Sequence, residues 1–272
     1  MRAGQVLRPK RPRSFQITLT LSTVAVLVFL VGSSLRPWSP KRGLGLAFGV
    51  LAALLFVVEM LYPARRPRAQ PFRSAMGWLQ FHVHAGAFAL VAALVHTGFR
   101  LPSGRLGWWL LALSSWTVAT GLLGVWLQKW IPASLAEGLR VEAIYERIPS
   151  LVDELRAEAD RLMQGAGDVL ERFYRSEVRA PLAAVNRSWA FLLDVRGGRE
   201  RALEPFRRVA QFVDAGERQR VLDLMSIYTE KMELDAHYSL QGILRGWLVL
   251  HVPAAGLLMG LLAVHVFSWF WY

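Results

Sequence analysis

The sequence predicts an all-α integral membrane protein with about five transmembrane helices and a helical extramembrane insert. Three observations lead to this prediction. Hydrophobic residues make up 54% of the 272 residues, and the mean hydropathy is +0.30. The apolar residues are concentrated in blocks of about 20, the length that a helix needs to cross a bilayer. Charged residues lie in the connectors and in one long polar stretch, and Trp and Tyr gather at several block ends, as at membrane interfaces.

The elements follow in order from these blocks. A basic segment, residues 1–14, precedes a first block that is long enough to span a bilayer, so a cleavable signal peptide is not expected. The membrane segments after the first span are expected at 43–129 and 246–272, on either side of the polar insert 130–245. The candidate spans are residues 15–34, 43–62, 77–99, 107–128 and 247–271.

Basic residues in the short loops predict the orientation. Segments 1–13 and 63–76 together carry nine Lys and Arg residues, whereas loops 35–42 and 100–106 carry five. The positive-inside rule then predicts a cytoplasmic N-terminus, and a bacterial inner membrane is the expected location. The same topology places the insert in the cytoplasm.

The insert is predicted to be helical. The stretch SLAEGLRVEAIYERIPSLVDELRAEADRLM has apolar residues at steps of three and four, and PLAAVNRSWAFLLDV and the stretch from Glu200 to Tyr228 follow the same pattern. It contains no Gly-rich phosphate loop and no metal-ligand cluster. A docking or bracing domain is therefore the expected role.

Composition also excludes several chemistries. The chain has no cysteine, which excludes disulfides, iron–sulfur clusters, thiolate catalysis and covalent haem attachment. The net charge of +12 is explained by basic residues that flank apolar blocks, so no nucleic-acid partner is expected.

Four of the six histidines form a regular pattern in two spans. His82 and His96 are 14 residues apart, and so are His251 and His265. Fourteen residues are close to four helical turns, so each pair lies on one helix face, about 21 Å apart along the axis. Since one span separates these two helices, they run in the same direction. The first histidine of each helix is then expected at one depth and the second at another.

Facing imidazoles at two depths are what two six-coordinate b-type haems require, because each iron takes one nitrogen from either side. Low-spin iron with both axial positions filled suits electron transfer. Gly107 and Gly121 are also 14 residues apart, so the span between the histidine helices could let two macrocycles approach its backbone, although close helix packing is the more frequent reason for such glycines.

Two His-x(13)-His helices with a Gly-bearing helix between them resemble the dihaem cytochrome b of quinol–cytochrome c oxidoreductases and related membrane subunits. The resemblance implies that His82 pairs with His251, that His96 pairs with His265, and that spans two to five form a four-helix dihaem bundle. The first span and the long insert depart from the family pattern, and no Pro-Glu-Trp-Tyr quinol signature is present.

Other polar residues near the spans are weaker candidates. Candidate haem-propionate partners are basic residues at span ends, although plain topology charges explain them equally well. His84 points roughly 200° away from His82 and is expected to be a packing residue, an interface residue or a hydrogen-bond partner. His237 precedes the fifth span and is expected in the insert, at the cytoplasmic surface. Glu59, an acid inside a span, is either a proton carrier at a quinone site or a side chain that reaches the interface. The propionate candidates are Arg73, Arg100, Arg245, Arg105 and Lys129.

The sequence therefore predicts transmembrane electron transfer through two haem b groups in the membrane subunit of a redox complex. Expected partners are the lipid bilayer, a quinone, and redox proteins such as cytochrome c, iron–sulfur or flavin proteins. A transmembrane haem-dependent reductase that acts on a metal or small acceptor remains an alternative. A non-redox transporter or scaffold is a further alternative, for which Pro253 is the only clear helix-break candidate.

Overall fold

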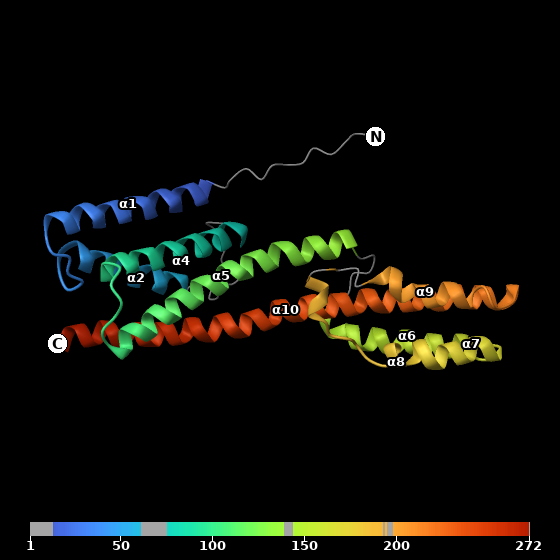
Figure 1. Cartoon of the computed structure of the whole chain (residues 1–272). Helices are drawn as coiled ribbons and strands as arrows, with labels where there is room; N and C mark the ends of the chain where they lie inside the picture. The colour runs from blue at the N-terminus through green and yellow to red at the C-terminus, as the bar shows by residue number, and fades with distance from the viewer. Residues whose placement is uncertain (1–12, 61–74, 139–143, 193, 195–197, 272) are drawn as a thin grey trace, which may run out of the picture. The chain divides into compact units, whose positions relative to one another are not determined.

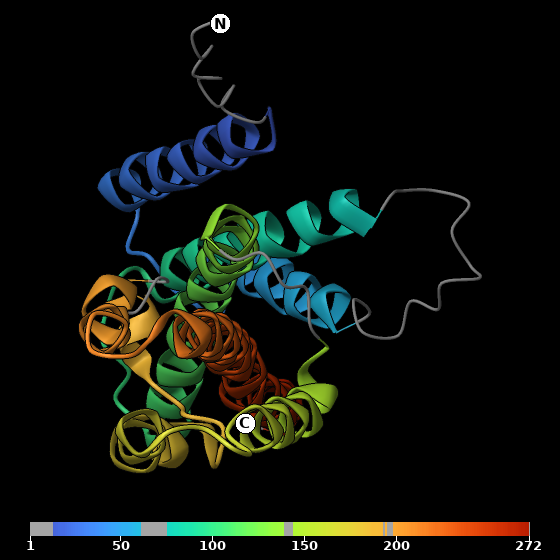
Figure 2. The same ribbon diagram turned by 90° about the vertical axis from the view of Figure 1, so that its right-hand side faces the viewer.

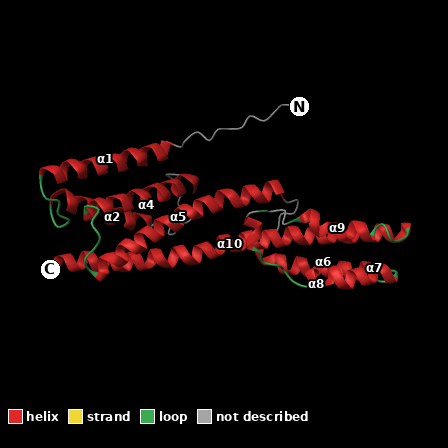
Figure 3. Ribbon diagram, in the orientation of Figure 1, coloured by secondary structure: helices red, strands yellow, loops and turns green. Residues whose placement is uncertain are grey.

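The computed structural model describes residues 13–60, 75–138, 144–192, 194 and 198–271. Within these ranges every regular element is helical and no strand occurs (Figure 3), which confirms the all-α class. Four helices are long and apolar enough to cross a membrane, and α2 (Gly43–Glu59) is apolar but shorter, at 17 residues. The four are α1 (Arg13–Leu35), α4 (Ala75–Thr97), α5 (Arg105–Gly138) and α10 (Ala215–Trp271).

The count of five spans stays a prediction because of α2. Its 17 residues extend over about 25 Å at 1.5 Å per residue, slightly less than a ~30 Å hydrocarbon core. The last two residues of predicted span 43–62, together with the connector to α4, lie outside the described residues.

The chain divides into two compact units. Met1–Val125 and Val249–Tyr272 form one, here called the membrane unit, and Trp126–Leu248 forms the other, the polar unit. The predicted insert, 130–245, lies within the polar unit. Helices α5 and α10 each contribute residues to both units, and α10 is continuous over 57 residues, through Pro253 (Figure 1). The fifth predicted span is thus the second part of a much longer helix.

In the membrane unit, α2 and α4 pack side by side and α1 packs on α4 (Figures 1 and 2). Trp38, in the connection between α1 and α2, joins all three helices. Its indole N–H donates a hydrogen bond to the Val95 carbonyl at 2.9 Å, and its ring meets Phe29 edge-on with centroids 5.0 Å apart. An indole with its N–H bonded and its ring packed against neighbours fixes the end of α4 next to the start of α2.

One apolar cluster joins the four helices that the sequence assigned to the haem bundle. Its buried members are Phe56 of α2, Ala89 of α4 and Leu258 of α10, and leucines of α5 pack against it. Ala89 is seven residues from both His82 and His96, and Leu258 is likewise midway between the other two histidines. Seven residues are about 10 Å along a helix, so this apolar layer separates the two histidine levels.

The polar unit is built around the first part of α10. Helix α6 buries Ile148, Val152, Leu155 and Ala159, which recur every three or four residues and form one apolar face. These side chains join a core to which α10 contributes Val221 and Leu224 among others. The remaining elements are η1 (Tyr145–Arg147), α6 (Ile148–Leu162), α7 (Asp168–Phe173), η2 (Tyr174–Val178), α8 (Arg179–Leu182), η3 (Trp189–Leu192) and α9 (Arg199–Val209).

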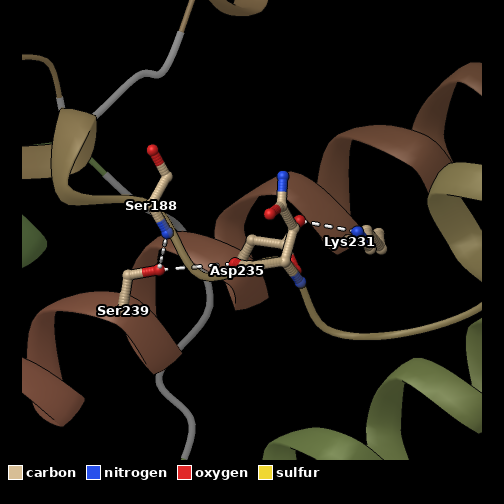
Figure 4. Close-up of polar contacts among 5 residues, drawn as sticks. Ser188, Lys231, Asp235 and Ser239 are labelled. Carbon is tan, nitrogen blue, oxygen red and sulfur yellow. Dashed lines mark hydrogen bonds and ion pairs between the residues drawn. The ribbon is translucent and has the colours of Figure 1, made fainter.

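The prediction of a helix over PLAAVNRSWAFLLDV is wrong. Helix α8 ends at Leu182, the following residues are irregular, and only the short η3 is helical. The irregular residues bond to side chains of α10 instead of to each other. The Asn186 N–H donates to the Asp235 carboxylate at 2.9 Å, and the Ser188 N–H donates to the Ser239 hydroxyl at 3.1 Å (Figure 4). Partners distant in the sequence thus replace the local helical bonds.

Asp235 also forms a buried ion pair. The Lys231 ammonium lies 2.6 Å from the Asp235 carboxylate, and their side chains are 3% and 7% exposed (Figure 4). Burial raises the pKa of Asp235, and the hydrogen bond from Lys231 opposes that shift. Such a pair costs desolvation energy when it forms, so removal of one partner leaves an uncompensated charge in the core.

Asp235→Ala is expected to lower the free energy of unfolding of the polar unit by about 3–5 kcal/mol, because Lys231 and the Asn186 N–H both lose their acceptor. Circular dichroism during chemical denaturation of the full chain in detergent measures this change. Arg207→Ala removes an exposed ion pair with Glu200 and is expected to leave the denaturation midpoint unchanged. Equal midpoints for the two variants would contradict the importance of the buried pair.

Candidate functional site

The structure brings the rings of His82 of α4 and His251 of α10 close together. Their ring centroids are 6.3 Å apart and the ring planes are inclined at 82°. Imidazole nitrogens bind metals at about 2 Å, so two rings on opposite sides of one iron have centroids about 6 Å apart. The observed separation therefore matches that of two axial ligands of a single haem iron.

The second pair, His96 and His265, lies at the other end of the same two helices. His265 lies within electrostatic range of His96. Because the rings of the two first histidines lie close together and the two second histidines are within range of each other, α4 and this part of α10 run in the same direction. The pairing of the four residues as ligands stays a prediction.

Three of the four rings are held at Nδ1. His96 Nδ1 lies 2.8 Å from the Gly45 carbonyl oxygen, which can only accept, so Nδ1 carries the proton. His82 Nδ1 contacts the carboxylate of Glu59. Metal-binding histidines almost always donate their other ring N–H to a carboxylate, carbonyl or water, which fixes the tautomer and the ring orientation. In this tautomer the proton is on Nδ1, so Nε2 is the nitrogen that would coordinate a metal.

His251 is held by Thr120 of α5 in the same way. The Thr120 hydroxyl donates to the Trp116 carbonyl at 2.8 Å, and its oxygen lies 2.9 Å from His251 Nδ1. With its own proton directed to the carbonyl, the hydroxyl oxygen accepts from His251 Nδ1–H. In this tautomer Nε2 is the nitrogen of His251 that would coordinate a metal.

One of the two predicted glycines borders a histidine ring, and the other does not. A Cβ added at Gly121 would lie 3.5 Å from Cε1 of His251, so Gly121 of α5 does border this histidine. A Cβ at Gly107 would meet Pro102 at 2.7 Å, because the preceding loop folds over the first turn of α5. Gly107 therefore borders its own loop, and its spacing of 14 from Gly121 does not indicate a second haem contact.

Two glycines of α2, Gly45 and Gly49, also belong to the site and were not predicted. A Cβ at Gly49 would lie 2.5 Å from His96 Nδ1, so only glycine admits the ring at this point. The two glycines are one turn apart, and the ring of His96 lies against both, bonded to one carbonyl. The spacing of four residues is visible in the sequence, but glycines are common in membrane helices and nothing local links these two to a histidine.

The predicted propionate partners have different surroundings. Arg100 and Arg105 are exposed near the His96 end of the membrane unit, whereas Arg73 lies outside the described residues. Arg245 belongs to the polar unit, where it pairs with Glu146 and lies 4.3 Å above the Tyr145 ring. This contact favours a structural role for Arg245 over a propionate contact, since its charge already has an acidic partner. Lys129 is exposed on α5 and likewise belongs to the polar unit.

A cavity of about 430 Å³ adds a basic residue that the prediction did not include. It is lined by Lys41, His265, Ser268 and Trp269. An ammonium and a hydroxyl beside the imidazole are groups that bind a carboxylate. Lys41 thus joins Arg100 and Arg105 as a candidate partner for an anionic group at this end.

One further expectation needs correction. The Glu59 side chain does not extend toward the interface, because it is 10% exposed and contacts His82. His237 lies in the polar unit, where it is 6% exposed on α10 and 3.5 Å from Gln241. Irregular residues between α8 and η3 bond to Asp235 and Ser239 on this part of α10. His84 is half-buried on α4.

Within the described ranges, no three His, Asp or Glu side chains converge to hold a metal ion directly. The four histidines are proposed to act as two pairs. Two imidazoles suit a metal whose other ligands come from a macrocycle. Comparisons of the chain with models of protein families, with curated proteins and with solved structures find no match.

Proposed function

We propose that this integral membrane protein carries electrons through two b-type haems, one held by His82 and His251 and the other by His96 and His265. The close approach of His82 and His251, with ring centroids 6.3 Å apart, is the single observation that carries the proposal. The resemblance to dihaem cytochrome b, which rests on the spacing of the same residues, points to the same function.

The surroundings of the histidines are suited to a bound haem. Acceptors at Nδ1 hold His82, His96 and His251 in the tautomer whose Nε2 coordinates a metal, and Gly121 borders His251. Haem, when bound with both axial positions filled, supplies one-electron transfer without an open position for oxygen. The residues of this chain orient the ligands, and the layer of Phe56, Ala89 and Leu258 keeps an apolar medium between the two levels.

A role as one subunit of a redox complex follows from what surrounds the two levels. The predicted site residues comprise ligands and charge partners but no group for hydride or acyl chemistry, so donor and acceptor belong to other molecules. A quinone in the bilayer and a redox protein are the partners proposed. The polar unit, with its own core, is the proposed docking surface for such a protein in the cytoplasm.

An absorption spectrum of the purified full-length protein tests the proposal. We expect a b-type spectrum on dithionite reduction and close to two haems per chain, extractable with acidified acetone because no cysteine can hold them covalently. A colourless preparation from haem-replete cells would exclude the proposed function.

The same preparation separates the rival functions. A transporter or scaffold lacks the spectrum, whereas a direct reductase shows it and is also reoxidised by a soluble ferric chelate without any partner protein. The continuity of α10 through Pro253 already disfavours the transporter, because transporters use broken helices at the membrane midplane.

A further inference from the structure

Glu59 is the only acidic residue in the membrane unit: the other 19 Asp and Glu residues of the chain all lie within 126–248. It ends α2, its side chain is 10% exposed, and it contacts Nδ1 of His82. A buried carboxylate without a partner costs several kcal/mol, so acids within apolar segments are rare and their partners carry information.

The three Nδ1 acceptors of the site differ in charge. His96 donates to a backbone carbonyl and His251 to a hydroxyl, both of them neutral groups. Only His82 is bonded to a carboxylate. A carboxylate that accepts the Nδ1 proton makes the imidazole a stronger electron donor through Nε2. A stronger donor, and the negative charge beside it, favour the oxidised state of a metal bound at Nε2.

We propose that Glu59 is a positioning residue that acts through His82 and makes the His82–His251 haem the lower-potential haem of the two. This inference rests on the proposed function. Electrons then pass downhill from the His82–His251 level to the His96–His265 level. The donor is expected to deliver electrons at the end where α2 terminates in Glu59, and the acceptor to take them at the end where α2 begins.

Redox titration of Glu59→Gln tests this role. The amide keeps an oxygen that accepts from Nδ1–H but loses the charge. The titration is made in a His96→Ala background, which is expected to retain only the His82–His251 haem. Glu59→Gln is expected to shift the equilibrium constant for reduction of this haem at least tenfold toward the reduced state. For a one-electron couple this is a rise in midpoint potential of about 59 mV. Partial loss of haem does not affect the measured potential, because the titration reports only the bound fraction.

Thr120→Val is the matched control, because it removes the neutral acceptor from the opposite ligand of the same iron. We expect it to shift the potential less than Glu59→Gln does. An unchanged potential in Glu59→Gln, or complete loss of the haem from this variant, would overturn the role of Glu59. Absence of haem from the wild-type protein would instead refute the proposed function itself, so the two failures are distinguishable.

Discussion

His82→Ala and His251→Ala are each expected to remove the same one of the two haems, and His96→Ala and His265→Ala the other. Each substitution would delete one of the two proposed axial ligands and would leave the iron five-coordinate at best. Because the two levels lie on either side of the layer of Phe56, Ala89 and Leu258 and have different neighbours, their potentials differ and a redox titration identifies the component that remains.

Double variants sharpen this result. A second alanine within a pair is expected to add little to the first, because the haem is already lost, whereas one alanine from each pair removes both haems. His84→Ala is the control and is expected to retain both. Loss of the same redox component from His82→Ala and His265→Ala would contradict the parallel arrangement of α4 and α10 and the proposed pairs.

Gly49→Ala is expected to lose the His96–His265 haem while the other haem remains. The added methyl group would lie 2.5 Å from Nδ1 and 2.7 Å from Cε1 of His96, so the ring must move away from the Gly45 carbonyl that orients it. Loss of such a supporting contact typically costs 10–100-fold in metal affinity, about 1.4–2.7 kcal/mol. Haem content per chain and the redox titration measure the effect.

Gly256→Ala on α10 is the matched control, since a Cβ at this position meets nothing within 4 Å. It is expected to retain both haems, and alanine is also the better helix former. Full retention of both haems with an unchanged spectrum in Gly49→Ala would show that the position of His96 does not require the absence of a side chain at residue 49.

The membrane class and the histidine pattern could be predicted from the sequence alone. Apolar blocks of about 20 residues match the thickness of a bilayer, and a helical period of 3.6 turns a spacing of 14 into a shared face. Glu59 was recognised as unusual for a related reason, because a carboxylate inside an apolar block is costly. These properties depend on residues near one another in the chain, so periodicity and composition are enough to predict them.

The contacts of each side chain required the tertiary structure. The bond from His96 to Gly45 and the bond from His251 to Thr120 join residues 51 and 131 positions apart, a separation that no local pattern encodes. The same holds for Glu59, whose contact with His82 depends on the packing of α2 against α4. The helix predicted after α8 is wrong for the same reason. Acceptors on α10 bond to the N–H groups of these residues, and tertiary hydrogen bonds outweigh a weak local preference for helix.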